Sequence, residues 1–309
     1  MNLKKKRIFL SGHKGMVGSS IFRYLKAKNY KNIITINKDK LNLLDQKKTD
    51  NFIKKIKPDF VINAAARVGG ILANSNFKAE FIYENLTIQT NLINSSYNAG
   101  VKKLIFLGSS CIYPKLCKQP IKEEHLLTGK LEETNDAYAI AKIAGVKMCE
   151  AYNKQYNLQY ICLMPTNLYG PNDNYDLKYS HFFPALIKKV YLAKKKGKKK
   201  IDVWGNGKAK REIMYVDDLA SACEFFLKTK TRHSLINIGS GEERTIENFA
   251  KYVIKKFNAK VKIKFDKSKP NGTPRKIVDT SLAKSYGWKS KYNLDQGFKY
   301  TFEDFLKRN

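Results

Sequence analysis

The sequence predicts an α/β protein built on a doubly wound parallel sheet, with a smaller α/β lobe in the C-terminal half. Strand-like and helix-like segments alternate from the first residues, which is the pattern of parallel βαβ units. The strands are continuous apolar runs such as "DFVINAAA", as expected where helices cover both faces of a sheet. With 309 residues the chain is long enough for one or two domains.

The first half contains five expected strands and four expected helices. The strands are read at 7–12, 32–37, 59–66, 103–110 and 159–165, and the helices at 16–29, 49–57, 80–100 and 136–156. Beyond Pro165 the loops are rich in Asn, Pro and Gly. We therefore predict a nucleotide-binding domain over 1–165 and a substrate-binding lobe over 166–309. The apolar helix expected at 216–227 indicates that the chain returns to the first domain near 212–238.

The net charge of +32 does not by itself indicate a nucleic-acid partner. Only eight of the 59 basic residues are arginine, the residue that nucleic-acid readers favour for bidentate contacts. The lysine-rich run "KKKGKKK" at 194–200 is typical of a solvated loop after a helix. We predict no nucleic-acid binding, while anionic substrates remain compatible with the charge.

Neither a membrane segment nor a disulfide framework is expected. No apolar run approaches the ~20 residues that span a bilayer, and the apolar stretch near the N-terminus is too short for a signal peptide. The five cysteines are odd in number and form no CxxC motif, so neither paired disulfides nor a metal site is indicated. A reducing cytoplasm fits this usage best.

A glycine-rich loop separates the first strand from the first helix. The stretch "GHKGMVG" places Gly12, Gly15 and Gly18 at this turn. Glycines there let the backbone approach a pyrophosphate at the helix N-terminus, where free N–H groups favour anions. The context predicts a Rossmann dinucleotide site, although the GxxGxxG spacing differs from the common GxGxxG.

The residues around the cofactor ribose favour NADPH over NADH. An NAD site usually has an acidic residue at the end of the second strand, but this chain has Asn37 and Lys38 before Asp39. Lys14 adds a second cation in the glycine loop. Two cations near the ribose favour a 2′-phosphate.

A tyrosine and a lysine share one face of a predicted helix near the end of the fourth strand. Tyr138 and Lys142 of "YAIAK" are four residues apart. A neighbouring ammonium is expected to lower the pKa of the phenol, which is about 10 when unperturbed. Ser109, Ser110 and Cys111 follow the fourth strand at its carboxyl end, where ligands bind in doubly wound folds.

Ser109, Tyr138 and Lys142 resemble the catalytic triad of the extended short-chain dehydrogenase/reductases. The motifs "FLGSSCIYPK", "YAIAKIAG", "MPTNLYGPNDN", "SHFFPAL" and "NGTPRK" are similar, in order over 7–288, to the GDP-L-fucose synthase family. That resemblance implies 3,5-epimerisation of GDP-4-keto-6-deoxy-D-mannose, followed by reduction at C4 with NADPH. It also implies a homodimer.

The resemblance also assigns roles to individual residues. Cys111 is the expected base and His181 the expected acid in epimerisation, since a thiol of pKa about 8.5 is a better carbon base near neutrality than a serine hydroxyl. In reduction, Tyr138 is expected to protonate the C4 oxygen, with Ser109 hydrogen-bonded to it. Lys142 is expected to bind the nicotinamide ribose and to tune Tyr138.

Cofactor and substrate contacts follow from the same motifs. The implied cofactor-binding residues are Gly12, His13, Lys14, Gly15, Met16, Val17, Gly18, Lys38, Leu107, Gly108, Ser109, Ser110, Lys142, Pro165, Thr166, Asn167, Leu168 and His181. Those implied for the GDP part of the substrate are Lys189, which replaces the usual arginine, and Trp204, Arg211 and Asp279.

Two alternatives stay open at this point. A nucleotide-sugar 4-epimerase or 4,6-dehydratase of the same superfamily shares the triad, but a dehydratase typically has an Asp–Glu pair where this chain has Ser110 and Cys111. The second alternative is a catalytically silent protein that senses NADP or binds nucleic acid. The complete set of Ser109, Tyr138 and Lys142 disfavours it.

Overall fold

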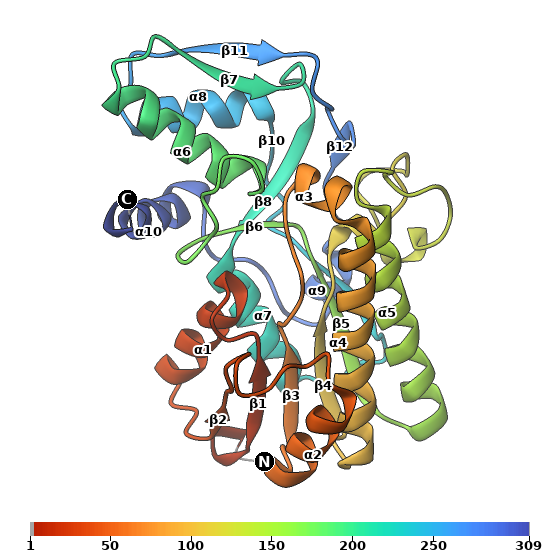
Figure 1. Cartoon of the computed structure of the whole chain (residues 1–309). Coiled ribbons are helices and arrows are strands. Elements are labelled where there is room, and N and C mark those ends of the chain that lie inside the picture. Colours follow the sequence, from red (N-terminus) through yellow and green to blue (C-terminus); the bar gives the residue numbers. More distant parts are fainter. Residues whose placement is uncertain (1–2, 309) are drawn as a thin grey trace.

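The computed structural model describes residues 3–308 and contains the expected parallel sheet. Its six strands lie in the order β2-β1-β3-β4-β5-β9 (Figure 1). All neighbours in this sheet are parallel. Their bounds are Ile8–Ser11 for β1, Ile33–Ile34 for β2, Phe60–Asn63 for β3, Lys103–Leu107 for β4, Gln159–Pro165 for β5 and Leu235–Ile238 for β9. The prediction of a doubly wound α/β fold is confirmed.

Each central strand buries alternate side chains on opposite faces of the sheet. The helices involved are α1 (Met16–Ala27), α2 (Gln46–Ile56), α4 (Lys78–Asn98), α5 (Asp136–Tyr156) and α7 (Val216–Lys228). Ile105 and Leu107 of β4 belong to the core formed with α1 and α7, whereas Leu104 and Phe106 belong to the core formed with α2, α4 and α5. Because both faces are covered, the strands are apolar throughout.

The second part of the chain forms a lobe above the carboxyl ends of these strands (Figure 1). Its sheet centres on β8 (Lys210–Tyr215), which pairs with β6 (Asn167–Tyr169), β10 (Glu243–Thr245) and β12 (Arg275–Lys276). A separate pair joins β7 (Lys200–Trp204) to β11 (Lys262–Asp266). The remaining helices are α3 (Ile71–Asn76), α6 (Phe182–Lys195), α8 (Ile246–Lys256), α9 (Ser281–Ser285) and α10 (Leu294–Lys307).

The chain crosses between the two parts more than once. Strand β8 belongs to the upper lobe, but α7 follows it directly and packs on the large sheet, and β9 then pairs with β5. The segment expected to return, 212–238, spans these elements. The assignment of separate domains to 1–165 and 166–309 stays a prediction.

Several local predictions differ from the structure. The strands expected over 59–66 and 103–110 end at Asn63 and Leu107. The strand expected over 32–37 has only Ile33 and Ile34 in the sheet, because β2 lies at an edge and pairs with β1 alone. The helix expected from residue 49 begins at Gln46, since the Asp45 carboxylate accepts a hydrogen bond from the Lys48 N–H at 2.9 Å and caps it. Helix α3 was not predicted. By contrast, α5 and β5 have the expected bounds.

At two positions of the glycine loop, neighbouring backbone atoms leave no space for a Cβ atom. Gly12 has φ +72°, and a Cβ there would meet the Ala64 carbonyl oxygen at 2.6 Å. A Cβ on Gly18 would overlap the Gly12 backbone. At Gly15, in contrast, the nearest atom to a Cβ is the Gly12 oxygen at 3.5 Å, an ordinary contact.

None of the helices within residues 3–308 is long and apolar enough to cross a bilayer.

Gly18→Ala is expected to destabilise the protein by about 1–3 kcal/mol, because the added methyl forces α1 away from Gly12. Thermal unfolding of the purified variant measures this change. Gly15→Ala is the matched control and is expected to leave the melting temperature almost unchanged. Equal melting temperatures for wild type and Gly18→Ala would contradict this account of the close approach.

Candidate active site

All five residues with expected catalytic roles line one cleft of about 350 Å³. The cleft lies at the carboxyl ends of β1, β3, β4 and β5, beneath the C-terminal lobe. These five residues come from three separate parts of the chain: Ser109, Cys111, Tyr138, Lys142 and His181. The position is the one that doubly wound folds use for ligands.

The end of β4 presents Ser109 and Cys111 to the cleft. The strand stops at Leu107, and a short 3₁₀ turn over Ser110–Ile112 follows. The Ser109 hydroxyl caps this turn by accepting a hydrogen bond from the Cys111 N–H at 3.3 Å. Cys111 is only 7% exposed, so its thiol lies in a largely dry environment at the wall of the cleft.

Helix α5 carries Tyr138 and Lys142 on one face, as their spacing predicts. Lys142 is 2% exposed, and its ammonium donates a hydrogen bond to the Leu107 carbonyl at 2.9 Å. It lies 4.8 Å from the ring centroid of Phe106 and 5.8 Å from that of Tyr138. One buried ammonium therefore joins the catalytic helix to the end of β4.

The prediction that Lys142 lowers the pKa of Tyr138 does not hold for this structure. Burial raises the pKa of the Tyr138 phenol, and negative charge on Cys111 raises it further. Lys142 itself has its pKa lowered to about 8, mainly by burial. The ammonium faces the tyrosine ring and binds a carbonyl, so its charge does not offset the desolvation of the phenol.

Two cations on neighbouring strands of the C-terminal lobe also line the cleft. Lys276 of β12 is the register partner of Arg211 of β8, and both side chains line the cleft. Loss of hydration lowers the pKa of the Lys276 ammonium, while negative charge on Cys111 raises it. His181 directly precedes α6. Loss of hydration and the positive charge of Lys276 lower the pKa of its imidazole.

Lys276 and Glu132 are cleft residues that the sequence reasoning missed. Glu132 is 8% exposed, and its carboxylate pairs with the Lys115 ammonium at 3.0 Å. Its charge also acts on Lys276 and on Arg211. The motif "NGTPRK" was a signal for Lys276, because it ends on this residue. No comparable motif marks Glu132.

Residues expected to bind the GDP part lie along the C-terminal lobe. The Lys189 ammonium donates to the Asp202 carbonyl at 2.8 Å and lies 5.7 Å from the Trp204 ring centroid. Arg211 donates to the carbonyls of Thr273 and Asn271 at 2.5 and 3.2 Å. Burial lowers the pKa of Arg211 to about 10. Lys189, Trp204 and Arg211 all line the cleft.

Asp279 is placed differently from the expectation. It is absent from the cleft wall, and its carboxylate accepts a hydrogen bond from the Ser281 N–H at 2.7 Å, at the start of α9. Its own N–H donates to the Ile121 carbonyl at 2.7 Å. The position therefore favours a structural role for Asp279 over contact with the substrate.

The expected cofactor residues fall into three groups. Eleven line the cleft: Met16, Val17, Leu107, Gly108, Ser109, Lys142, Pro165, Thr166, Asn167, Leu168 and His181. Five form the loop at the start of α1, outside the cleft wall: Gly12, His13, Lys14, Gly15 and Gly18. The last two are Lys38, exposed in the turn after β2, and Ser110, which is 2% exposed and does not line the cleft.

The start of α1 fits the pyrophosphate of a dinucleotide. Its N-cap residue is Gly15, whose backbone has no side-chain cap, and the first helical turn has no acidic residue. The first N–H groups of a helix lack partners within it and favour an anion. Gly12 and Gly18 leave no space there for a side chain of their own, so the backbone itself forms the cradle.

The described residues were compared with the geometry of disulfides and of metal sites. All five cysteines are free, and no group of three or more His, Cys, Asp or Glu within residues 3–308 has an arrangement able to hold a metal ion.

Comparisons with known proteins agree on the family. Residues 8–239 match the NAD dependent epimerase/dehydratase family. A GDP-L-fucose synthase of Sinorhizobium fredii is 49% identical over 98% of this chain and 96% of its own length. GDP-L-fucose synthase 1 of Arabidopsis thaliana is 48% identical, over 99% and 95%. Among solved structures, a GDP-mannoheptose C4 reductase from Campylobacter jejuni with NADP bound has a TM-score of 0.90 at 34% identity, covering 98% of this chain and 99% of its own.

These matches extend over nearly the whole chain, and the chain therefore belongs to the NAD dependent epimerase/dehydratase family and, within it, to the GDP-L-fucose synthases.

Proposed function

We propose that this protein epimerises GDP-4-keto-6-deoxy-D-mannose at C3 and C5 and then reduces C4 with NADPH, giving GDP-L-fucose. The observation that carries this proposal is the single cleft shared by Cys111, Tyr138 and His181. A sugar ring bound there has a thiol, a phenol and an imidazole within one enclosure. The cations Lys189 and Arg211 on the same cleft suit the diphosphate of a GDP-sugar.

Epimerisation needs a base and an acid on opposite faces of the sugar. The C4 ketone makes the hydrogens at C3 and C5 acidic, because the resulting carbanion is stabilised as an enolate. Cys111 accepts the proton as a thiolate, and His181 returns one from the other face. The pKa of His181 is lowered, so its ring is mostly neutral near pH 7 and must take up a proton before it can return one to carbon; the imidazolium is then a strong acid toward the enolate.

Reduction follows in the same cleft. NADPH, when bound, supplies the hydride for C4. Tyr138 protonates the oxygen at C4, and Ser109 donates a hydrogen bond to that oxygen. The raised pKa of Tyr138 keeps its phenol protonated until an alkoxide, which is a stronger base than the phenolate, develops at C4 and takes the proton. Lys142, which holds α5 to β4, binds the nicotinamide ribose and orients Tyr138 relative to the ring.

Lys276 supplies the positive charge that epimerisation needs. Its ammonium interacts electrostatically with Cys111 and with His181, the proposed base and acid. A cation that acts on both groups stabilises the thiolate and the negative charge that develops on the enolate. The proposal thus includes Lys276 as a residue that acts on the first half-reaction.

The proposal extends to assembly and location. We propose a homodimer formed through α4 and α5, which run side by side (Figure 1). Tyr83 on α4 and Ile140 on α5 are 63% and 47% exposed, which is unusual for large apolar side chains outside an interface. The five free cysteines support a cytoplasmic location. Nucleic acid is not among the proposed partners.

Cys111→Ser is expected to slow incorporation of solvent deuterium at C3 and C5 far more than Tyr138→Phe does. NMR of the GDP-keto-sugar in heavy water measures this exchange. Tyr138→Phe is expected to reduce NADPH oxidation by about 10²–10⁴-fold while exchange continues. Equal exchange in wild type and Cys111→Ser would refute the base assignment, and full reduction by Tyr138→Phe would refute the acid assignment.

Lys276→Met is expected to slow the same exchange by about tenfold or more, equivalent to roughly 1.4 kcal/mol in the barrier. Lys276→Arg keeps the charge and is expected to retain most of the rate. Exchange at the wild-type rate in Lys276→Met would rule out this role.

Replacement of Tyr83 and Ile140 together by glutamate is expected to convert the dimer to a monomer, since four buried charges would face each other across the interface. Light scattering after size-exclusion chromatography measures the mass. Leu306→Glu, on α10 and 49% exposed, is the control and is expected to stay dimeric. A wild-type protein that is monomeric at all concentrations would contradict the dimer.

A further inference from the structure

We propose that Asn172 is a positioning residue for NADPH, because its side-chain amide holds the glycine loop in the form that binds the pyrophosphate. The inference rests on the NADPH-dependent function proposed above. Asn172 lies in the stretch after β6, far from the glycine loop in sequence. None of the roles derived so far involves it.

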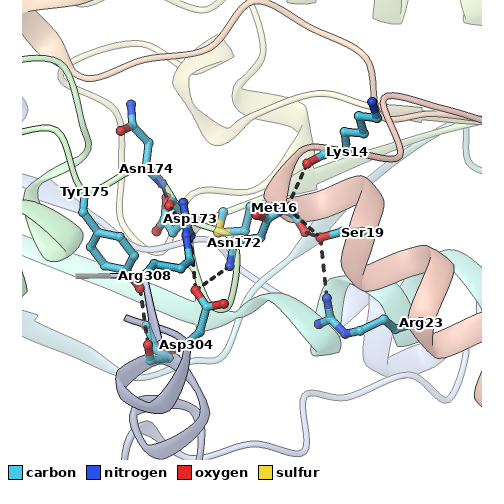
Figure 2. Close-up of polar contacts among 11 residues, drawn as sticks. Lys14, Met16, Ser19, Arg23, Asn172, Asp173, Asn174, Tyr175, Asp304 and Arg308 are labelled. Atoms are coloured by element: carbon cyan, nitrogen blue, oxygen red, sulfur yellow. Dashed lines mark hydrogen bonds and ion pairs between the residues drawn. The ribbon is translucent and has the colours of Figure 1, made fainter. Parts of the chain in front are cut away.

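The Asn172 amide contacts the glycine loop directly. Its Nδ2 donates a hydrogen bond to the Lys14 carbonyl at 2.8 Å and a longer one to the Ser19 hydroxyl at 3.4 Å (Figure 2). Lys14 lies between Gly12 and Gly15, and Ser19 lies in the first turns of α1. One amide therefore joins the loop to the helix whose N-terminus receives the anion. The Lys14 side chain extends away from this contact.

The backbone of Asn172 is held in turn by the C-terminal helix. Its φ is +68°, a left-handed conformation that non-glycine residues seldom adopt, although asparagine tolerates it best. Its N–H donates to the Asp304 carboxylate of α10 at 2.9 Å. Arg308 donates to the same carboxylate at 3.2 Å and to the Asp173 carbonyl at 3.0 Å (Figure 2). Such conformations persist where the surroundings fix them, and they cluster at functional sites.

These bonds form a connection from α10 through Asn172 to the glycine loop. A loop built from glycines loses more conformational freedom on ordering than other loops. Contacts that order it before the cofactor arrives reduce the entropy lost on binding, and so increase affinity. Asn172 contacts no atom of the proposed chemistry. Its effect is therefore expected on cofactor binding and not on the chemical steps.

Two variants separate the amide from the backbone. Asn172→Gly keeps the left-handed conformation and the N–H bond to Asp304, and removes only the side chain. Asn172→Asp keeps the shape but places a carboxylate oxygen against the Lys14 carbonyl. We expect the Kd for NADPH, measured by titration of its fluorescence, to rise about 3- to 10-fold in Asn172→Gly and further in Asn172→Asp. The kcat at saturating NADPH and the KM for the GDP-keto-sugar are expected to stay within about twofold, since the amide touches only the loop.

Asn174→Gly is the matched control from the same loop. The Asn174 side chain accepts a hydrogen bond from the Asp176 N–H at 2.9 Å, and we expect its removal to leave the Kd for NADPH unchanged. An unchanged Kd in Asn172→Gly would overturn the inference. A rise in the Kd accompanied by an equal rise in the KM for the sugar and a lower melting temperature would also overturn it, in favour of a general structural role. Failure of the wild type itself to bind NADPH would instead refute the proposed function.

Discussion

The hydrogen bond from the buried Lys142 ammonium to the Leu107 carbonyl is the contact on which the site depends. It joins the first turns of α5 to the last residue of β4. Tyr138 lies one turn before Lys142, and Cys111 lies just beyond Leu107. A phenol and a thiol that are distant in sequence are thus brought to one wall of the cleft. Burial makes this bond strong, because water does not compete for either partner.

The C-terminal lobe supplies what the parallel sheet lacks. The part of the molecule built on the large sheet presents Ser109, Cys111, Tyr138 and Lys142, whereas the C-terminal part of the chain presents His181 and the cations of β8 and β12. Two-sided proton transfer at a sugar carbon requires groups on both faces of the ring, so neither part of the molecule forms the proposed epimerase site alone. The repeated crossing of the chain between the parts, through α7 and β9, ties them together.

The charged residues that bear on function are the few that the fold brings together in the cleft. The chain carries 59 basic residues, and most of its lysines are spread over the surface. In the cleft, however, Lys276 and Arg211 are paired by strand register and act on one another, and Glu132 acts on both. Within such an enclosure charges interact more strongly than on the surface. Because the sequence is rich in lysine, the cations of the cleft cannot be distinguished from surface lysines by sequence alone.

The sequence by itself determined the parallel sheet and the glycine turn between its first strand and first helix, and it predicted the residues of the proposed chemistry. The sheet, the turn and the shared face of Tyr138 and Lys142 follow from local signals, namely apolar runs, glycines before a helix and a four-residue spacing. The roles of Cys111 and His181 rest on the resemblance to the family. Only the tertiary structure decided that Lys276 lines the cleft and interacts electrostatically with Cys111, that Asp279 binds the Ser281 N–H at the start of α9, and that burial raises the pKa of Tyr138. It alone also revealed the contact of Asn172 with Lys14. Burial, strand register and contacts between distant segments depend on how elements pack, and no spacing along the chain records them.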